Sequence, residues 1–173
     1  IFHRDFPNYG SVMWLLVHMM LPGTAEENLA KIWGDIVRLY DEFDILNRYW
    51  VIRRSMFNTK AQPKMKGKAA EVKDLLPVLV SVWKKYYNRD LDIHRKILVV
   101  LQGSFHMDDL LSQHPSDYAL PSDVADDLLA TCCITLSTWR EVFRHFKREN
   151  VQPPLFGLTA KAHYLMHCCV LSR

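Results

Sequence analysis

The sequence predicts an all-α protein, an irregular bundle of six to seven helices with no significant sheet. Apolar residues recur at steps of three and four over most of the chain, which is the spacing of a buried helix face. Gly, Pro, Thr and Asp interrupt these stretches at positions typical of helix ends. The apolar fraction of 49% is sufficient for a buried core, so a disordered chain is excluded. A length of 173 residues fits one helical domain, 1–173.

The first elements are defined by their breakers and caps. Residues 1–10 are expected to be irregular, because Pro7 and Gly10 are helix breakers. Residues 12–21 are apolar on nearly all sides, which predicts a short helix buried all round. Residues 25–43 form the best-defined helix, because Thr24 and Glu27 have the spacing of a capping box.

The remaining elements follow from the same signals. Residues 44–66 are expected to be an irregular or short helical connection, and 68–87 a helix that Pro77 kinks or restarts. Asp92 is expected to cap a helix that ends near residue 113. Its inward residues are predicted to be Ile93, Ile97, Leu101, Phe105 and Leu110. The longest helix is expected over 123–149, with acids at its start and bases at its end, and Thr159 is expected to cap a final helix.

Composition limits the cellular setting. A net charge of +3 is mildly basic and permits an acidic partner. The ten apolar residues 12–21 are about half of a bilayer span, so no transmembrane span is expected. No signal peptide is recognisable. The four cysteines form two adjacent pairs, which predicts reduced thiols and an intracellular location, with a cross-link between two helices as the alternative. Because the chain begins at Ile1 and its last helix has no stop signal, we expect a fragment of a longer protein.

Histidine and cysteine gather near the end of the chain. His163 and His167 are four residues apart, so on a helix both imidazoles face one side and can share a metal ion. A structural zinc site needs two more ligands, for which Cys168 or, from the long helix, Cys132 or Cys133 are candidates. The alternative is a packed terminal helix without metal, and this is the preferred interpretation because a helical core of this size needs no metal. No cofactor is predicted.

A basic run suggests contact with nucleic acid. Residues 53–73 contain one acid, Glu71, and seven bases: Arg53, Arg54, Lys60, Lys64, Lys66, Lys68 and Lys73. Trp50 and Phe57 lie nearby. Loop cations with neighbouring aromatic rings suit a phosphate backbone and stacked bases. The alternative is a solvated loop whose lysines only maintain solubility.

The signals for catalysis are weak. The paired acids 108–109 and 126–127 each lie within one expected helix, as on a solvated face or a helix N-terminus. The sequence has no Gly-rich phosphate loop, no Ser-His-Asp order and no nucleophile elbow. We therefore expect no enzymatic activity from the isolated chain.

Four segments together resemble one family. They are Asp5-Phe-Pro-Asn-Tyr-Gly-Ser11, Leu21-Pro-Gly-Thr-Ala-Glu-Glu-Asn28, Pro63-Lys-Met-Lys-Gly-Lys-Ala-Ala-Glu71 and Leu155-Phe-Gly-Leu-Thr-Ala-Lys-Ala-His-Tyr-Leu-Met-His167. In this order they resemble an abundant group of proteins encoded by mobile elements in dinoflagellate genomes. The layout of that group is similar to transposases of the CACTA and KDZ kinds, whose RNase H-like core carries a helical insertion between its second catalytic Asp and its final Glu.

The resemblance implies that this chain is the helical insertion, with Asp5 aligned with the catalytic Asp that opens it. The chain lacks the first Asp, the final Glu and the sheet, so the two-metal site is incomplete.

Two function classes follow from the sequence. The first is a non-catalytic, nucleic-acid-binding helical domain of a transposase-like protein, which implies a nuclear location. The second is a structural or protein-interaction subunit of a larger organellar or membrane-associated complex, with residues 12–21 as the contact surface.

Overall fold

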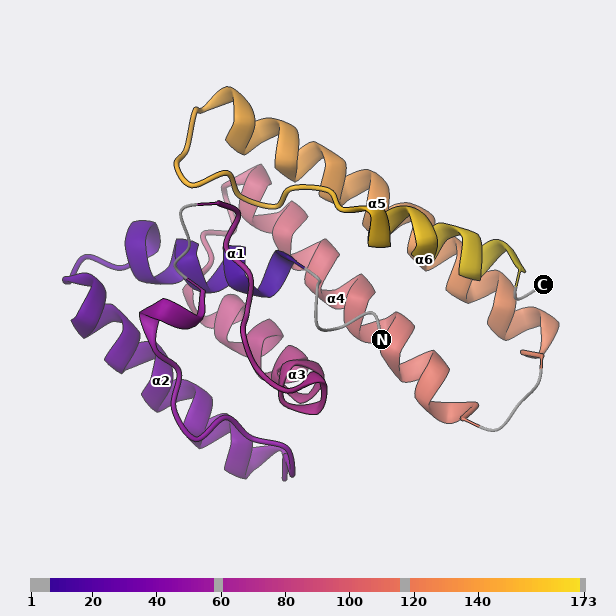
Figure 1. Cartoon of the computed structure of the whole chain (residues 1–173), viewed down its shortest axis with the longest axis horizontal. Coiled ribbons are helices and arrows are strands. Elements are labelled where there is room, and N and C mark those ends of the chain that lie inside the picture. The colour runs from indigo at the N-terminus through magenta and orange to yellow at the C-terminus, as the bar shows by residue number, and fades with distance from the viewer. Residues whose placement is uncertain (1–6, 58–60, 116–118, 172–173) are drawn as a thin grey trace.

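The computed structural model describes residues 7–57, 61–115 and 119–171, and within these residues every regular element is a helix (Figure 1). The all-α prediction is therefore confirmed. The elements, in chain order, are α1 (Pro7–Leu15), the π-helix η2 (Leu16–Met20), α2 (Ala25–Glu42), the 3-10 turn η3 (Arg54–Met56), α3 (Ala69–Tyr86), α4 (Asp92–Gln113), α5 (Ser122–Arg148) and α6 (Ala160–Leu171).

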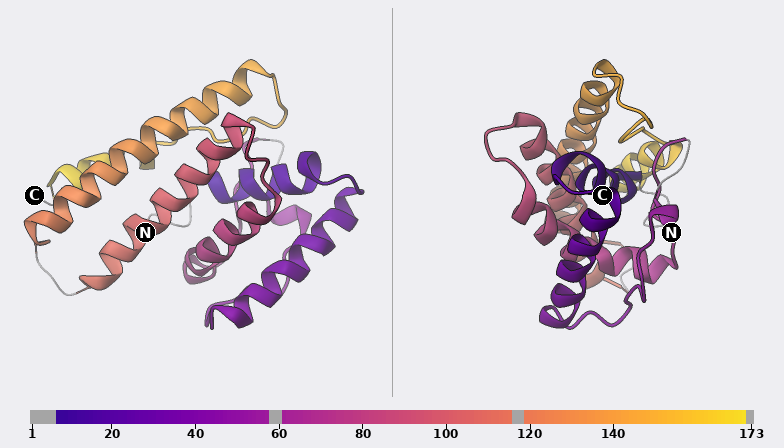
Figure 2. Two further views of the ribbon diagram at one scale, coloured as in Figure 1. Left: turned by 180° about the vertical axis from the view of Figure 1, so that it is seen from behind. Right: turned by 90° about the vertical axis from the view of Figure 1, so that its left-hand side faces the viewer.

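The helices form two packed groups that share one core. Helix α5 lies between α4 and α6, and α3 contacts both α4 and α2 (Figures 1 and 2). Helix α1 continues into η2, which packs against α2. The largest fully buried side chains include Trp83 of α3 and Trp139 of α5. Each indole N–H donates to a backbone carbonyl. Trp83 donates to the carbonyl of His94 at 3.1 Å, and Trp139 donates to the carbonyl of Phe156.

Helix α1 begins earlier than the breakers predict. Pro7 is its first residue, a position that tolerates proline because the missing N–H would have no helical acceptor. Gly10 lies inside the helix, where a Cβ atom would stand 2.6 Å from the carbonyl oxygen of Pro63. Here the glycine permits a close approach by another segment and does not end a helix.

Burial of residues 12–21 is only partly as predicted, because five of the ten are buried, four are half-buried and Met19 is 54% exposed. The expected contact of this stretch with a larger complex stays a prediction.

The corner between η2 and α2 is held by one buried amide. Asn28 Nδ2 donates to the carbonyls of Val17 at 2.8 Å, Gly23 at 2.9 Å and Leu21 at 3.1 Å. Its Oδ1 accepts from Gly23 N–H at 3.1 Å. Asn28 thus satisfies carbonyls that the end of η2 leaves without helical partners. The predicted capping box of Thr24 with Glu27 is present at the start of α2.

Two predictions about α3 and α4 need correction. Pro77 does not restart α3 as a second helix, because α3 is one helix from Ala69 to Tyr86. The alternative, a kink at Pro77, stays a prediction. An interior proline costs about 3 kcal/mol, whereas each fully buried aliphatic side chain contributes about 1.5–3 kcal/mol. Leu75, Leu76, Val78 and Leu79 are all buried, so packing outweighs the proline.

In α4, Leu91 is the N-cap residue and Asp92 is the first helical residue. The buried face is formed by Ile97, Val100, Leu101, Ser104 and Met107, while Phe105 is 41% exposed. A step of four from residue 93 drifts off a face whose true period is 3.6, which explains the error at Phe105.

Helices α4 and α5 cross closely at one glycine. A Cβ atom on Gly103 would lie 2.0 Å from Thr135 Oγ1, so a larger residue at 103 separates the helices or displaces Thr135. At the start of α6, the hydroxyl of Thr159 has no hydrogen-bond partner among the described residues. Thr159 therefore precedes the helix without capping it through its side chain.

Candidate nucleic-acid interface

The seven bases predicted to contact nucleic acid separate into three sets. Arg54 forms an ion pair with Glu26, and Lys73 lies 3.7 Å from Asp108, so both charges are locally compensated. Lys60 lies outside the described residues. Arg53, Lys64, Lys66 and Lys68 are exposed and form no ion pair within the part of the chain that the structure describes.

Three of the exposed lysines lie on one extended segment, residues 61–68, which we call the lysine strap. Burial alternates along it. Pro63 and Met65 are buried and Gly67 is half-buried, whereas Lys64, Lys66 and Lys68 are exposed. Alternation with a period of two places the three ammonium groups on the outer side of an extended chain. At about 3.3 Å per residue, successive lysines start about 6.6 Å apart along the strap.

The strap is attached to the helical body at its first half. Gln62 Nε2 donates to the carbonyl of Gly157 at 2.9 Å. The backbone at Pro63 and Lys64 lies against Gly10 of α1, where no Cβ intervenes. Figure 1 shows the strap passing in front of α1 before it enters α3.

The second half of the strap is attached to residues 49–57. The backbone N–H of Lys66 donates to the carbonyl of Met56 at 3.0 Å. Gly67 lies against Tyr49, whose hydroxyl oxygen would be 2.1 Å from an added Cβ. The N–H of Lys68 donates to Glu71 Oε2 at 2.8 Å, which begins α3. The lysines therefore project from a backbone that is held at both ends.

The segment that receives Gln62 is itself held by α1 and α5. Phe156 has a positive φ of 55°, a conformation that costs a non-glycine residue about 1 kcal/mol or more. Its N–H donates to Ser11 Oγ at 3.0 Å, and its carbonyl accepts from the indole of Trp139. Its ring stacks on Phe146 at 5.4 Å between centroids. These contacts fix the backbone that presents Gly157 to the strap.

Of the two aromatic residues near the basic run, only Trp50 is available to a ligand. Phe57 is completely buried, so the expectation that it contributes to stacking is wrong. Trp50 is 95% exposed and directly follows Tyr49, which contacts Gly67 of the strap. Exposed aromatic rings together with lysines are the combination found in single-strand-binding grooves.

The described residues show no metal site, and the predicted set that includes His163 stays a prediction. Within residues 7–57, 61–115 and 119–171, no group of three or more His, Cys, Asp or Glu side chains is placed to hold a metal ion. His167 and Cys168 are exposed, and the side chain of His163 lies outside the description.

Cys132 of α5 faces Cys169 of α6. The hydrogen bond between these two thiols, together with burial, raises the pKa of Cys132, and the same hydrogen bond lowers the pKa of Cys169. Both thiols are buried, and none of the four cysteines forms a disulfide, so the alternative of a cross-link between two helices is wrong.

The acidic candidates do not converge either. Asp5 lies outside the described residues. Asp108 approaches Lys73, while Asp127 Oδ2 lies 2.8 Å from His106 Nε2 and its Oδ1 accepts from Thr131. Each carboxylate thus has its own local partner, and the two acidic pairs form no shared site.

Sequence reasoning missed two features of the strap. The letters PKMKGK at 63–68 alternate apolar or small residues with lysine, and this signal distinguishes a fixed strap from a solvated loop. The role of Gly10 as the seat of the strap had no local signal, because it depends on a contact with residues more than fifty positions away.

Comparisons with protein-family models, with curated proteins and with solved structures gave no match to this chain. No helix among the described residues has the length and apolar character needed to cross a membrane.

Proposed function

We propose that this domain binds single-stranded nucleic acid along the lysine strap, as a non-catalytic helical part of a transposase-like protein. The observation that supports the proposal is the alternation of Pro63, Met65 and Gly67 toward the body with Lys64, Lys66 and Lys68 toward solvent. Flexible solubilising lysines need no such fixed backbone. A row of outward ammonium groups neutralises successive phosphates and releases counterions.

Trp50 favours a single strand over a duplex. Its ring is 95% exposed, and such exposure of the largest apolar side chain has no stabilising role in the folded chain. Stacking of one unpaired base on an aromatic ring contributes about 1–3 kcal/mol. Arg53, three residues further on, adds a cation that forms no ion pair within the described residues. The resemblance to transposases is consistent with this function and with a nuclear location.

The test compares two triple variants of equal charge. Lys64→Gln, Lys66→Gln and Lys68→Gln together remove the strap charges. Lys31→Gln, Lys84→Gln and Arg140→Gln remove three exposed charges elsewhere, so both variants change the net charge from +3 to 0. Binding is measured by fluorescence anisotropy of a labelled single-stranded oligonucleotide at low salt.

We expect the strap variant to bind about tenfold or more weakly than the wild type, and the control variant to bind nearly as well as the wild type. Trp50→Ala is expected to weaken single-strand binding about tenfold and duplex binding little. Equal losses in the two triple variants would show that only net charge matters and would reject the strap as the interface.

A protein-interaction role is the second candidate, and exposed apolar side chains favour it. Leu46 is 86% exposed, and Phe43, Trp50 and Val51 lie exposed on the same connection. Such a patch is typical of surfaces that contact another protein. Leu46→Ser distinguishes the candidates, because it leaves oligonucleotide affinity unchanged in the first case. In the second case it abolishes association, which sedimentation with the partner complex detects.

A further inference from the structure

A second basic surface lies away from the strap, between the start of α4 and the end of α5. Residues of the two helices line a groove with a volume of about 750 Å³. Figure 2 (right) shows the connection that leads into α4 on the opposite side of the molecule from the strap. We call this cavity the α4–α5 groove. Its volume falls within the range of small-molecule sites, about 300–1,000 Å³.

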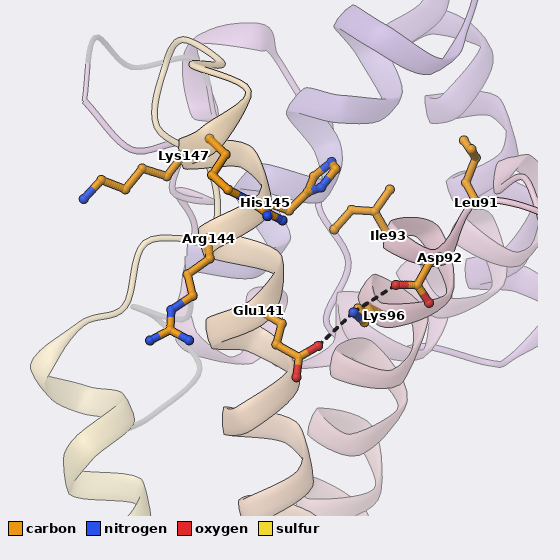
Figure 3. A pocket seen from close by; sticks show the side chains of 9 residues that line it. Leu91, Asp92, Ile93, Lys96, Glu141, Arg144, His145 and Lys147 are labelled. Carbon is orange, nitrogen blue, oxygen red and sulfur yellow. Dashed lines mark ion pairs between the residues drawn. The ribbon is translucent and has the colours of Figure 1, made fainter.

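The acids of the groove already have cationic partners. Lys96 Nζ lies 2.9 Å from Asp92 Oδ2 and 2.8 Å from Glu141 Oε2, and Arg95 Nη2 lies 3.3 Å from Asp92 Oδ1, so two cations balance the two carboxylates. Figure 3 shows Lys96 held between them, while Arg144 and Lys147 extend away from this ion-paired cluster. The negative charges of the groove are thus not available to compensate further cations.

The remaining cations of the groove have no carboxylate partner. Arg144, Lys147 and Arg148 are exposed and form no ion pair within the described residues. Part of this charge matches the dipole at the C-terminus of α5. The dipole accounts for a charge near the last turn, whereas Arg144 lies a full turn before Arg148. Because all three cations line the groove at the end of α5, they make it attractive to an anion.

Apolar groups complete the groove. Leu91, at the N-cap of α4, is 46% exposed, and Ile93 is half-buried beside it. His145 points from α5 toward Ile93 (Figure 3). An inorganic ion gains nothing from contact with these apolar side chains, whereas the organic part of a phosphate ester can pack on them. Guanidinium groups form paired hydrogen bonds with phosphate oxygens, which favours phosphate among the anions.

We propose that the α4–α5 groove binds a small organic phosphate, with Arg144 and Arg148 on the phosphate and Leu91 and Ile93 under the organic part. This site is separate from the strap and does not depend on nucleic-acid binding there.

The test uses three probes with the chain of 173 residues. Adenosine monophosphate supplies a phosphate and an organic part, pyrophosphate supplies only the anion, and adenosine only the organic part. Isothermal titration calorimetry at low salt is expected to show the monophosphate binding more tightly than pyrophosphate and adenosine not binding. Arg144→Gln and Arg148→Gln are each expected to weaken the binding of the monophosphate about tenfold, because each removes one charged hydrogen bond.

Two control variants make the result specific. Arg140→Gln removes the same charge one turn earlier on α5, outside the residues that line the groove, and is expected to leave the affinity unchanged. The strap variant with Lys64→Gln, Lys66→Gln and Lys68→Gln is also expected to bind the monophosphate normally.

Four results would overturn the proposal: no heat with the monophosphate, pyrophosphate binding as tightly as the monophosphate, an equal loss in Arg140→Gln, or an equal loss in the strap variant. Circular dichroism verifies the fold of each variant, which is expected to be intact because these side chains are exposed.

Discussion

Replacing Gly10 by alanine tests whether the strap is packed on α1 as described. Helix propensity alone predicts a gain of about 0.8–1 kcal/mol from this change in a helix interior. The structure predicts the opposite sign. The new methyl group would lie 2.6 Å from the Pro63 carbonyl oxygen and 2.7 Å from two backbone atoms of Lys64. The first contact is 0.8 Å inside the 3.4 Å at which ordinary contact begins.

The contacting atoms are backbone, so no side-chain rotation relieves the overlap. The strap must move away from α1, and such overpacking costs about 1–3 kcal/mol. After subtraction of the helix-propensity gain, we expect Gly10→Ala to lower the free energy of unfolding by about 1 kcal/mol. Because the lysines move with the strap, oligonucleotide affinity is expected to fall as well.

Gly34 provides the matched control. It lies in α2, is exposed, and has no atom within 4 Å of an added Cβ. Gly34→Ala is therefore expected to raise the free energy of unfolding by about 0.8–1 kcal/mol. Urea unfolding followed by circular dichroism measures both variants. If Gly10→Ala is as stabilising as Gly34→Ala, the strap does not rest on α1 and the proposed interface loses its support.

Three further predictions concern the helical body. Asn28→Ala is expected to cost about 3 kcal/mol in urea unfolding, since it removes two amide N–H donors and one carbonyl acceptor at about 1 kcal/mol each. A loss below about 0.5 kcal/mol would contradict this role. The backbone N–H and the hydroxyl of Thr24 hold the pKa of Glu27 below its usual 4.5. The contribution of this cap to stability is therefore fully present above pH 4.5 and disappears as the pH falls through the lowered pKa. Thr24→Ala removes the hydroxyl but keeps the backbone N–H, so an NMR titration is expected to show this pKa rising part of the way toward its usual range, and an unchanged pKa would refute the contribution of the hydroxyl. Gly103→Ala is expected to lower the free energy of unfolding by about 1–2 kcal/mol, because the new methyl group overlaps Thr135. Adding Thr135→Ala is expected to restore most of this free energy. If the effects of the two substitutions simply add, the contact is excluded.

Local signals predicted the elements well where the deciding interactions are local. The start of α2 depends on Thr24 and Glu27, three residues apart, and a capping box is readable from sequence. The errors occur where distant residues decide. Local rules predict a helix breaker at Gly10, but this glycine is needed for the contact with the strap. Local rules also predict an interruption at Pro77, but the buried residues around it keep the helix continuous. These contacts are tertiary, so no local rule contains them.

The candidate interface was only partly predictable for the same reason. Composition identified the basic run but not which of its charges are available. Lys66 is exposed and has no ion pair among the described residues, whereas Arg54 pairs with Glu26 in α2. It also treated Trp50 and Phe57 as equivalent, whereas one is exposed and the other is in the core. The α4–α5 groove had no sequence signal, because it joins residues about fifty positions apart.

The salt dependence of oligonucleotide binding tests the central proposal most directly. Each phosphate contact with a single strand contributes about 0.7 to the slope of log affinity against log salt concentration. If Lys64, Lys66 and Lys68 each contact a phosphate, the slope of the strap variant is expected to be shallower than that of the wild type by about 2. The control variant with Lys31, Lys84 and Arg140 replaced is expected to keep the wild-type slope. Identical slopes for the two triple variants, or wild-type binding that does not change with salt, would contradict the strap as the nucleic-acid interface.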